Sequence, residues 1–416
     1  MENGTVKNWR FQGNKKLTGA SGFTVRGVLN LLRGNLNEND PRPIIPLGHG
    51  DPSAFPCFRT ATVVEDAIVD SVRSANYNHY APTVGILPAR RHPGHIDDGY
   101  LTLGCIQAIE VILTTLARPG ANILLPRPGY PYYESLAAHI HLEVRHFDLL
   151  PEKGWEADLD SVEALADENT AAMLVINPGN PCGSVYTANI CRRDSNKAWY
   201  YGNCVFGHLA FGSTPYVPMG VFGSIVPIVT LGSISKRWVV PVKTPIPLSS
   251  TYNNDPGVLI FMLCTCHIVD SIKCFLDIST DLVTFIQGAL PQILEKTTEE
   301  LYSKIIDILR KAADICYDKM KEIPCITCPN KPEGGMFVMV KLNVSLMEGI
   351  NDDMDFAIQL AKEESVIVLP ALITCSIAML VSADVNEVIG VIQEIRPPSS
   401  PKDTRGDSDR QLHVGL

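Results

Sequence analysis

Three short apolar runs constrain the fold of this chain more than any other feature. Each lacks charged residues and ends in a loop rich in glycine, proline, asparagine or serine; the runs cover residues 121–125, 171–176 and 226–231. Uncharged runs of this length are typical of strands buried on both faces of a parallel sheet. Residues 104–117 have the apolar spacing of a helix. We therefore expect an α/β domain with a largely parallel sheet.

Ligands of such sheets bind at the carboxyl ends of the strands, so the loops after the runs are the expected place for chemistry. Lys236 follows the third run, and a lysine there can form a Schiff base, although an ordinary exposed lysine fits the pattern as well. Asn180 and Tyr130 lie in the other two loops, where an amide can hydrogen-bond and a ring can stack, or form plain turns. Gly104 and Cys105 begin a helix, whose N–H groups suit a phosphate.

The length of 416 residues predicts two or three domains. We divide the chain into an N-terminal segment (1–75), a large domain (76–320), a C-terminal small domain (321–396) and a disordered tail (397–416). Helices are expected at 60–74, 300–321 and 354–364, and a strand at 335–342. The uncharged stretch 365–383 contains Pro370 and predicts two buried strands with a turn, not a membrane helix.

The composition excludes several classes of protein. The net charge is −10 and there is no basic stripe, which argues against nucleic-acid binding. The first residues lack the apolar run of a signal peptide, and the 12 cysteines are scattered, so we expect reduced thiols and a cytoplasmic protein. Only the pair Cys325 and Cys328 has CxxC spacing, the other cluster being Cys264, Cys266 and His267, so no metal site is expected.

Taken together, the chain resembles the fold-type I pyridoxal-phosphate aminotransferases, and within them the plant tyrosine and nicotianamine aminotransferases. The likeness covers most of residues 9–240 and resumes with gaps over 270–370. The segments that carry it, in family order, are 47–53, 77–82, 104–110, 124–130, 176–183 and 231–238. The resemblance implies a large domain with a mostly parallel seven-stranded sheet sandwiched by helices, and a smaller α+β domain. It also implies that residues 1–75 contribute to the small domain and to a dimer contact.

The resemblance also implies the roles of individual residues. Lys236 would hold pyridoxal 5'-phosphate as an internal aldimine and later move the substrate proton. Gly104, Cys105 and Ser233 would cradle the phosphate, Tyr130 would stack on the ring, and Asn180 would bond its phenolic oxygen. Tyr80 would reach the cofactor of a neighbouring subunit in a homodimer, and Gly50 would lie against the carboxylate of the amino-acid substrate.

Four positions depart from the family pattern. Asn203 stands where the family has an aspartate that pairs with the ring nitrogen, and Phe206 stands in place of a cofactor-binding tyrosine. Thr244 falls at the phosphate-binding arginine, and Met379 at the arginine that binds the substrate carboxylate. A hydrogen bond to a charged group is worth roughly 1.5–3 kcal/mol, so the loss at Asn203 alone predicts a rate lower by one to two decades.

Three blocks, 89–99, 189–203 and 242–254, match nothing in the family pattern. The polar block 189–203 falls where a core strand belongs, and its composition does not favour one. Three functions therefore stay open. The first is transfer of an amino group from tyrosine or a related aromatic amino acid to 2-oxoglutarate. The second is a pyridoxal-phosphate carbon–sulfur lyase acting on a cystine-like substrate, and the third is a catalytically impaired relative.

Overall fold

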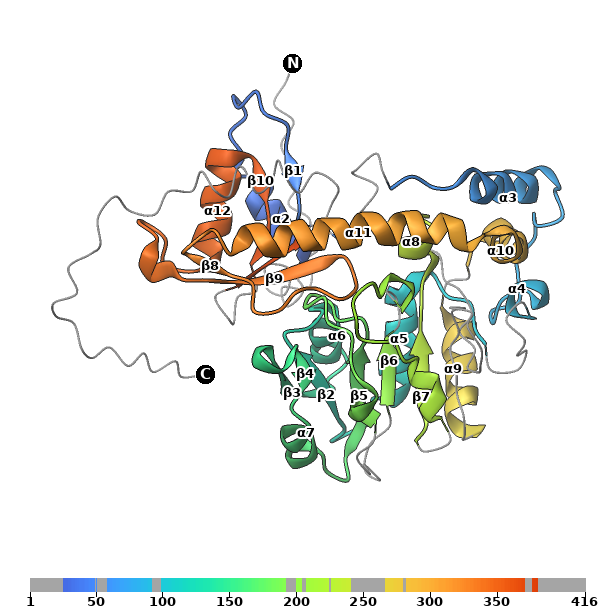
Figure 1. Ribbon diagram of the computed structural model, residues 1–416. Coiled ribbons are helices and arrows are strands. Elements are labelled where there is room, and N and C mark those ends of the chain that lie inside the picture. Colours follow the sequence, from blue (N-terminus) through green and yellow to red (C-terminus); the bar gives the residue numbers. More distant parts are fainter. Residues whose placement is uncertain are drawn as a thin grey trace, which may run out of the picture.

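The computed structural model describes residues 25–48, 50, 58–91, 99–191, 200–203, 207–223, 226–240, 266–279, 282–370 and 376–380. A twisted sheet lies at the centre of the large domain (Figure 1). Its described strands are, in spatial order, β4 (Glu156–Ala157), β3 (Glu143–Leu150), β2 (Asn122–Arg127), β5 (Thr170–Ile176), β6 (Tyr200–Asn203) and β7 (Ile228–Leu231). All neighbours pair in parallel except β3 and β4. The α/β prediction is confirmed, and this sheet has six strands within the described residues.

Both faces of this sheet are covered, which explains why its strands are apolar throughout. All seven residues of β5 are buried. Leu174 and Ile176 pack in one core cluster, whereas Met173 and Val175 pack in another, as the two-residue period of a strand requires. The first cluster contains residues of three helices, α5 (Gly104–Leu116), α6 (Tyr132–His139) and α9 (Cys266–Ile278). The opposite cluster includes α7 (Leu159–Leu165).

Strand β6 corrects one expectation from the sequence. The polar composition of 189–203 argued against a core strand, yet Tyr200–Asn203 pairs with both β5 and β7, and Asn203 lies opposite Ile176 and Leu231. A parallel ladder joins backbone groups, so four residues can complete it without the usual apolar side chains. Residues 92–98 and 192–199, and the whole block 242–254, lie outside the described residues.

The small domain contains a second sheet. Its order is β11 (Leu369–Pro370), β12 (Ser376–Leu380), β9 (Phe337–Leu342) and β8 (Ile326–Thr327). Helices α12 (Asp353–Glu364) and α2 (Val25–Arg33) pack with it in one core cluster, and β1 (Ile45–Pro46) pairs with β10 (Val366–Ile367). The stretch 365–383 therefore contains strands, as predicted. Among the described helices, none is long and apolar enough to cross a membrane.

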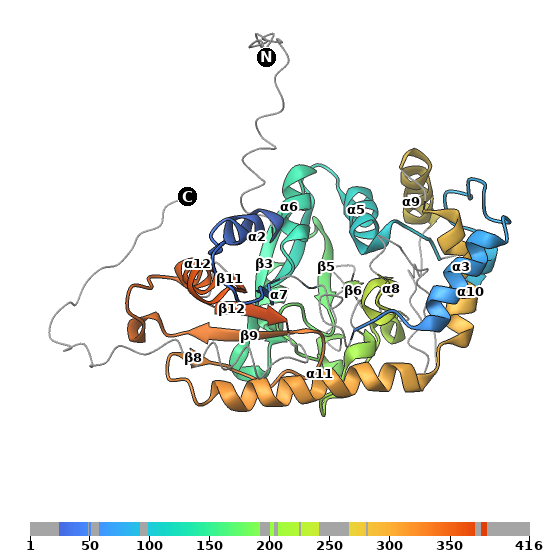
Figure 2. The same cartoon turned by 90° about the horizontal axis from the view of Figure 1, so that it is seen from above.

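Helix α11 (Glu299–Met320) runs along the molecule and connects its two ends (Figures 1 and 2). One end packs in the core of the small domain through Leu309, Cys316 and Met320. The other end places Tyr302 in a cluster with α3 (Thr62–Arg73), α4 (Leu87–Arg91) and α10 (Thr284–Lys296). The predicted helices at 60–74, 300–321 and 354–364 are confirmed within two residues at their ends.

Candidate active site

Lys236 lies at the carboxyl end of β7, in the one-turn helix α8 (Ile234–Arg237). Ser233 caps this turn: its Oγ accepts the backbone N–H of Ser235 at 3.1 Å and lies 3.0 Å from the Ser235 Oγ. A capped turn fixes the direction in which the lysine leaves the backbone. The Nζ of Lys236 donates a hydrogen bond to the carbonyl oxygen of Gly50.

Gly50 lies between the lysine and the small domain. A Cβ at this position would come within 2.9 Å of the Cζ of Phe337, the first residue of β9. The backbone can therefore approach Phe337 only because position 50 has no side chain. The structure thus brings together the predicted catalytic lysine and the predicted substrate-binding glycine, which are 186 residues apart.

The N-terminus of α5 has the geometry expected of an anion site. Gly104, its first residue, is buried and has a φ of +78°, a conformation that favours glycine. The backbone N–H of Leu103 donates to the Oε1 of Gln107 at 2.5 Å, and the Gln107 amide donates to Ser279 at 3.2 Å. The helix start is therefore anchored, and its first N–H groups and dipole favour a negative charge.

Tyr130 lies beside this helix start. Burial, the nearby Cys105 thiol and Tyr132 raise the pKa of the Tyr130 hydroxyl to about 12, so the hydroxyl is neutral at pH 7. The Tyr130 ring is 6.1 Å from that of Tyr133 and meets it edge-on. The structure thus places Cys105 and Tyr130, predicted as two separate features, close to each other.

Asn180 is half-buried in the loop after β5. The N–H of Gly179 donates to the Ser184 carbonyl at 2.7 Å, and the N–H of Gly183 donates to the Gly179 carbonyl at 3.0 Å. The buried Asn177 side chain also accepts the N–H of Tyr186 at 3.1 Å. These bonds close the loop, so Asn180 has a defined place at the edge of the sheet.

Other predicted positions are not brought to Lys236 by the described residues. Tyr80 is 94% exposed on the surface of the single chain. Asn203 ends β6, but nothing is described of its side chain, and Phe206 and Thr244 lie outside the described residues. Met379 lies in β12 opposite Val338, again with only its backbone described.

Sequence reasoning missed a buried cation next to the lysine. The Arg237 side chain is 4% exposed, and its guanidinium carbon lies 4.8 Å from the Trp238 ring and 4.4 Å from the Tyr302 ring. These are distances of cation–π contact. Burial and the charge of Arg237 hold the pKa of the adjacent His208 well below its usual value. The Lys-Arg-Trp order was visible in the sequence, but Tyr302 comes from α11 and gives no local signal.

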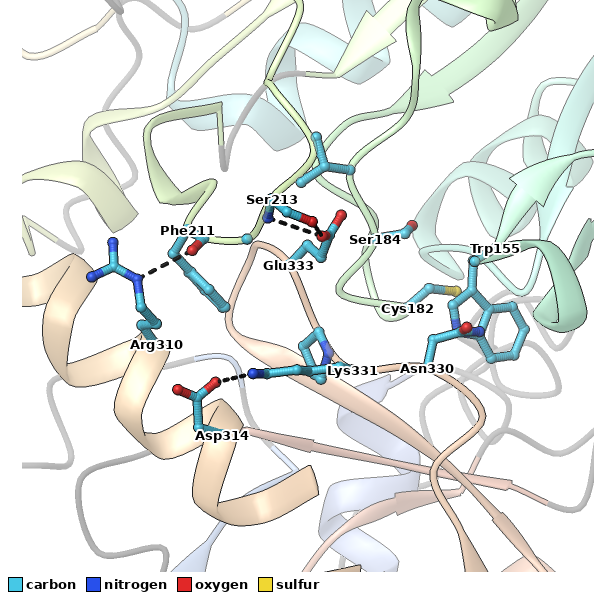
Figure 3. Close-up of a pocket in the computed structure, with 14 residues that line it drawn as sticks. Trp155, Cys182, Ser184, Phe211, Ser213, Arg310, Asp314, Asn330, Lys331 and Glu333 are labelled. Atoms are coloured by element: carbon cyan, nitrogen blue, oxygen red, sulfur yellow. Dashed lines mark hydrogen bonds and ion pairs between the residues drawn. The ribbon is translucent and has the colours of Figure 1, made fainter. Parts of the chain in front are cut away.

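A cavity of about 450 Å³ lies apart from these residues, at the junction of the two domains (Figure 3). It is lined by the loop after β5, by residues 211–213, by α11 and by the connection from β8 to β9. Its lining includes Trp155, Arg310 and Lys331 but neither Lys236 nor Tyr130. The described part of the chain contains no group of three or more histidine, cysteine or acidic residues that could hold a metal ion.

Comparison with known proteins decides the family. Residues 93–392 match the model of the family "Aminotransferase class I and II". The chain belongs to this family. It is 50% identical over 387 residues to nicotianamine aminotransferase 1 of Oryza sativa subsp. japonica, covering 88% of this chain and 77% of that protein. It is 47% identical over 385 residues to an S-alkyl-thiohydroximate lyase of Arabidopsis thaliana, covering 88% of this chain and 82% of that protein.

The fold comparison agrees with the family. The solved structure of the tyrosine aminotransferase from Leishmania infantum superposes with a TM-score of 0.81 at 25% identity, covering 93% of this chain and 98% of that one. An alanine aminotransferase from Pyrococcus furiosus has a TM-score of 0.80 at 18% identity, covering 92% and 99% of the two chains, and shows the shared fold. The aminotransferase is thus a fold-type I enzyme, as the resemblance implied.

Proposed function

We propose that this aminotransferase uses pyridoxal 5'-phosphate to transfer the amino group of tyrosine, or of a related aromatic amino acid, to 2-oxoglutarate. The observation that carries the proposal is the position of Lys236, on a capped turn at the carboxyl end of a parallel strand, in a chain of this family. The choice of an aromatic donor is supported by the similarity to a tyrosine aminotransferase.

The residues present fit this cofactor. Gly104 has a positive φ at the start of a 13-residue helix, which leaves backbone N–H groups for a phosphate. The neutral ring of Tyr130 lies beside that helix start, and Lys236 approaches from the end of β7. When bound, the cofactor supplies a ring that withdraws electrons from the α-carbon of the amino acid.

Each residue has a distinct task in this proposal. Lys236 holds the cofactor through Nζ and moves a proton to and from the α-carbon, and the Gly50 carbonyl orients the amine before the cofactor binds. The helix start at Gly104, with Ser233, binds the phosphate. Tyr130 would pack against the cofactor ring and exclude water, and the amide of Asn180 would donate a hydrogen bond to it.

The asparagine at position 203 sets the expected efficiency. Asn203 ends β6, where its backbone pairs with β5 and β7, but an amide carries no charge to pair with a protonated ring nitrogen. Loss of a charged hydrogen bond of roughly 1.5–3 kcal/mol lowers a rate by about one to two decades. We therefore expect turnover to be slow, and Asn203→Asp to raise it by about that factor.

The first experiment is to add pyridoxal phosphate to the purified chain and to record its visible absorbance before and after borohydride. We expect a band that borohydride fixes onto Lys236, as shown by peptide mass, and no such adduct in Lys236→Ala. Glutamate formed from tyrosine and 2-oxoglutarate would then confirm the transfer. A chain that gives no band and an unmodified Lys236 contradicts the proposal.

A carbon–sulfur lyase is the second candidate, because a lyase is among the relatives at 47% identity. Pyruvate and ammonia formed from cystine, with no 2-oxo-acid acceptor added, would favour it over the transferase. A homodimer is also proposed, since Tyr80 is 94% exposed in the single chain and could reach a neighbouring site. Sedimentation of wild type and Tyr80→Ala, with the cofactor affinity of both, tests this assembly.

A further inference from the structure

The connection between β8 and β9 of the small domain is inserted between two loops of the large domain. The N–H groups of Glu333 and Gly334 donate to the Gly183 carbonyl at 2.8 and 3.0 Å, in the loop after β5. On the other side, the N–H groups of Phe211 and Gly212 donate to the Glu333 carbonyl at 2.8 and 2.9 Å, in the loop after β6. Glu333 is therefore bonded through its backbone to both loops.

The side chain of Glu333 adds a second attachment (Figure 3). Its Oε1 accepts the N–H of Ser213 at 3.0 Å, the Oγ of Ser213 at 2.7 Å and the N–H of Thr214 at 3.3 Å. Burial opposes ionisation, but the hydrogen bonds from Thr214 and Ser213 outweigh it and lower the pKa of this carboxyl. Glu333 is thus ionised at neutral pH and holds residues 213–214 by charge-assisted bonds.

Glycines make this close fit possible. A Cβ at Gly212 would come within 2.4 Å of the Glu333 Cβ and Cγ, and a Cβ at Gly334 within 2.9 Å of Pro178. A Cβ at Gly183, whose φ is +68°, would come within 2.6 Å of the Phe337 carbonyl oxygen. The connection and the two loops are in direct contact at these glycines, although a cavity lies beside them, so a shift of the connection has to move the loops with it.

Two contacts of this connection link it to the proposed cofactor site. Gly183 closes the loop that carries Asn180, three residues earlier, through its bond to Gly179. Phe337, four residues after Glu333, packs against Gly50, whose carbonyl receives the Lys236 amine. The relative position of Asn180 and Lys236 therefore depends on where Glu333 is held.

We propose that Glu333 is a positioning residue for the cofactor site: it fixes the loops after β5 and β6 and thereby holds Asn180 in place relative to Lys236. It does not touch the cofactor itself. This inference rests on the proposed function, because it takes Asn180 and Lys236 as cofactor contacts.

The test compares wild type, Glu333→Gln, Glu333→Ala and the control Glu348→Ala, which removes an exposed carboxylate of the same domain. Hydrogen–deuterium exchange is measured first, without cofactor. We expect Glu333→Ala to raise exchange in both 177–184 and 207–214, and Glu348→Ala to change neither. Unchanged exchange in these two segments would overturn the proposal, whatever the cofactor does.

Pyridoxal phosphate is then titrated by its visible band. We expect the dissociation constant of Glu333→Ala to rise about fivefold or more, with a shifted pH midpoint of the band, and Glu333→Gln to restore part of the affinity. A folded Glu333→Ala with unchanged affinity and unchanged pH midpoint overturns the positioning role. If Glu333→Ala does not fold, Ser213→Ala, which removes the 2.7 Å donor, must raise exchange and weaken binding to a smaller extent. A wild type without any band refutes the proposed function, and the cofactor part of this inference with it, while exchange still decides whether Glu333 holds the loops.

Discussion

Replacement of Gly183 by alanine provides the sharpest check of how closely the two domains fit. Gly183 has a φ of +68°, and a methyl group there would come within 2.6 Å of the Phe337 carbonyl oxygen and 3.1 Å of the Pro332 Cβ. Gly120 is a matched control, because its φ is +79° but no atom lies within 4 Å of its built Cβ. Both substitutions place alanine in the left-handed region, at a cost of about 1–2 kcal/mol.

Only Gly183→Ala adds a steric term. Overpacking costs typically 1–3 kcal/mol, so we expect a total of about 2–5 kcal/mol for Gly183→Ala against about 1–2 kcal/mol for Gly120→Ala. The free energy of unfolding of both variants and wild type is measured by urea titration, followed by far-ultraviolet circular dichroism and by tryptophan fluorescence. Gly183→Ala should also weaken pyridoxal-phosphate binding, because its loop carries Asn180. Equal destabilisation by the two substitutions would refute the reasoning, since the backbone conformation alone would then explain both.

Three further substitutions have defined expectations. Burial and the Arg237 charge lower the pKa of His208 in the folded protein, so as the pH falls below 6.5 the unfolded chain binds a proton first and wild type loses stability. His208→Asn should remove this loss and make the stability depend less on pH below 6.5. Thermal midpoints of both proteins from pH 5 to 8 test this, and parallel curves would contradict it. The Asp352 Oδ1 caps α12 by accepting the Asp355 N–H at 2.7 Å. Asp352→Ala removes this cap and should lower the free energy of unfolding by about 1 kcal/mol in urea titration. Trp238→Phe loses the indole N–H bond to Thr297 at 2.9 Å and should cost about as much, an expectation that an unchanged urea midpoint would refute.

The sequence predicted the parts of the fold that local patterns determine. The apolar runs 121–125 and 171–176 became β2 and β5 because a strand buried on both faces has no place for charge. The prediction failed at β6, where Tyr200–Asn203 pairs through its backbone with strands on both sides. That pairing depends on distant segments, and composition within the block contains no information about them.

The same distinction applies to the site. The places of Lys236, Gly104 and Tyr130 in the fold could be predicted, because each lies in the loop or turn after a strand or begins a helix. The cation–π contact of Arg237 with Tyr302 and the bonds of Glu333 could not, because each joins segments separated by tens of residues. Residues that hold a site from a distance have no local signature, whereas those that face the ligand often lie at recognisable turns.

The contact between Lys236 and Gly50 has a consequence for how the enzyme matures. The reactive amine meets a carbonyl 186 residues earlier in the chain, beside a ring that comes 101 residues later, at Phe337. A growing chain shorter than 337 residues lacks at least one of these three groups, so this contact can form only after most of the chain has been made. The proposed cofactor would then selectively stabilise folded molecules, because a ligand present at 100 times its dissociation constant adds about 2.7 kcal/mol to the native state alone. Saturation with the cofactor would thereby shift the folding equilibrium toward copies in which the contact between Lys236 and Gly50 has formed.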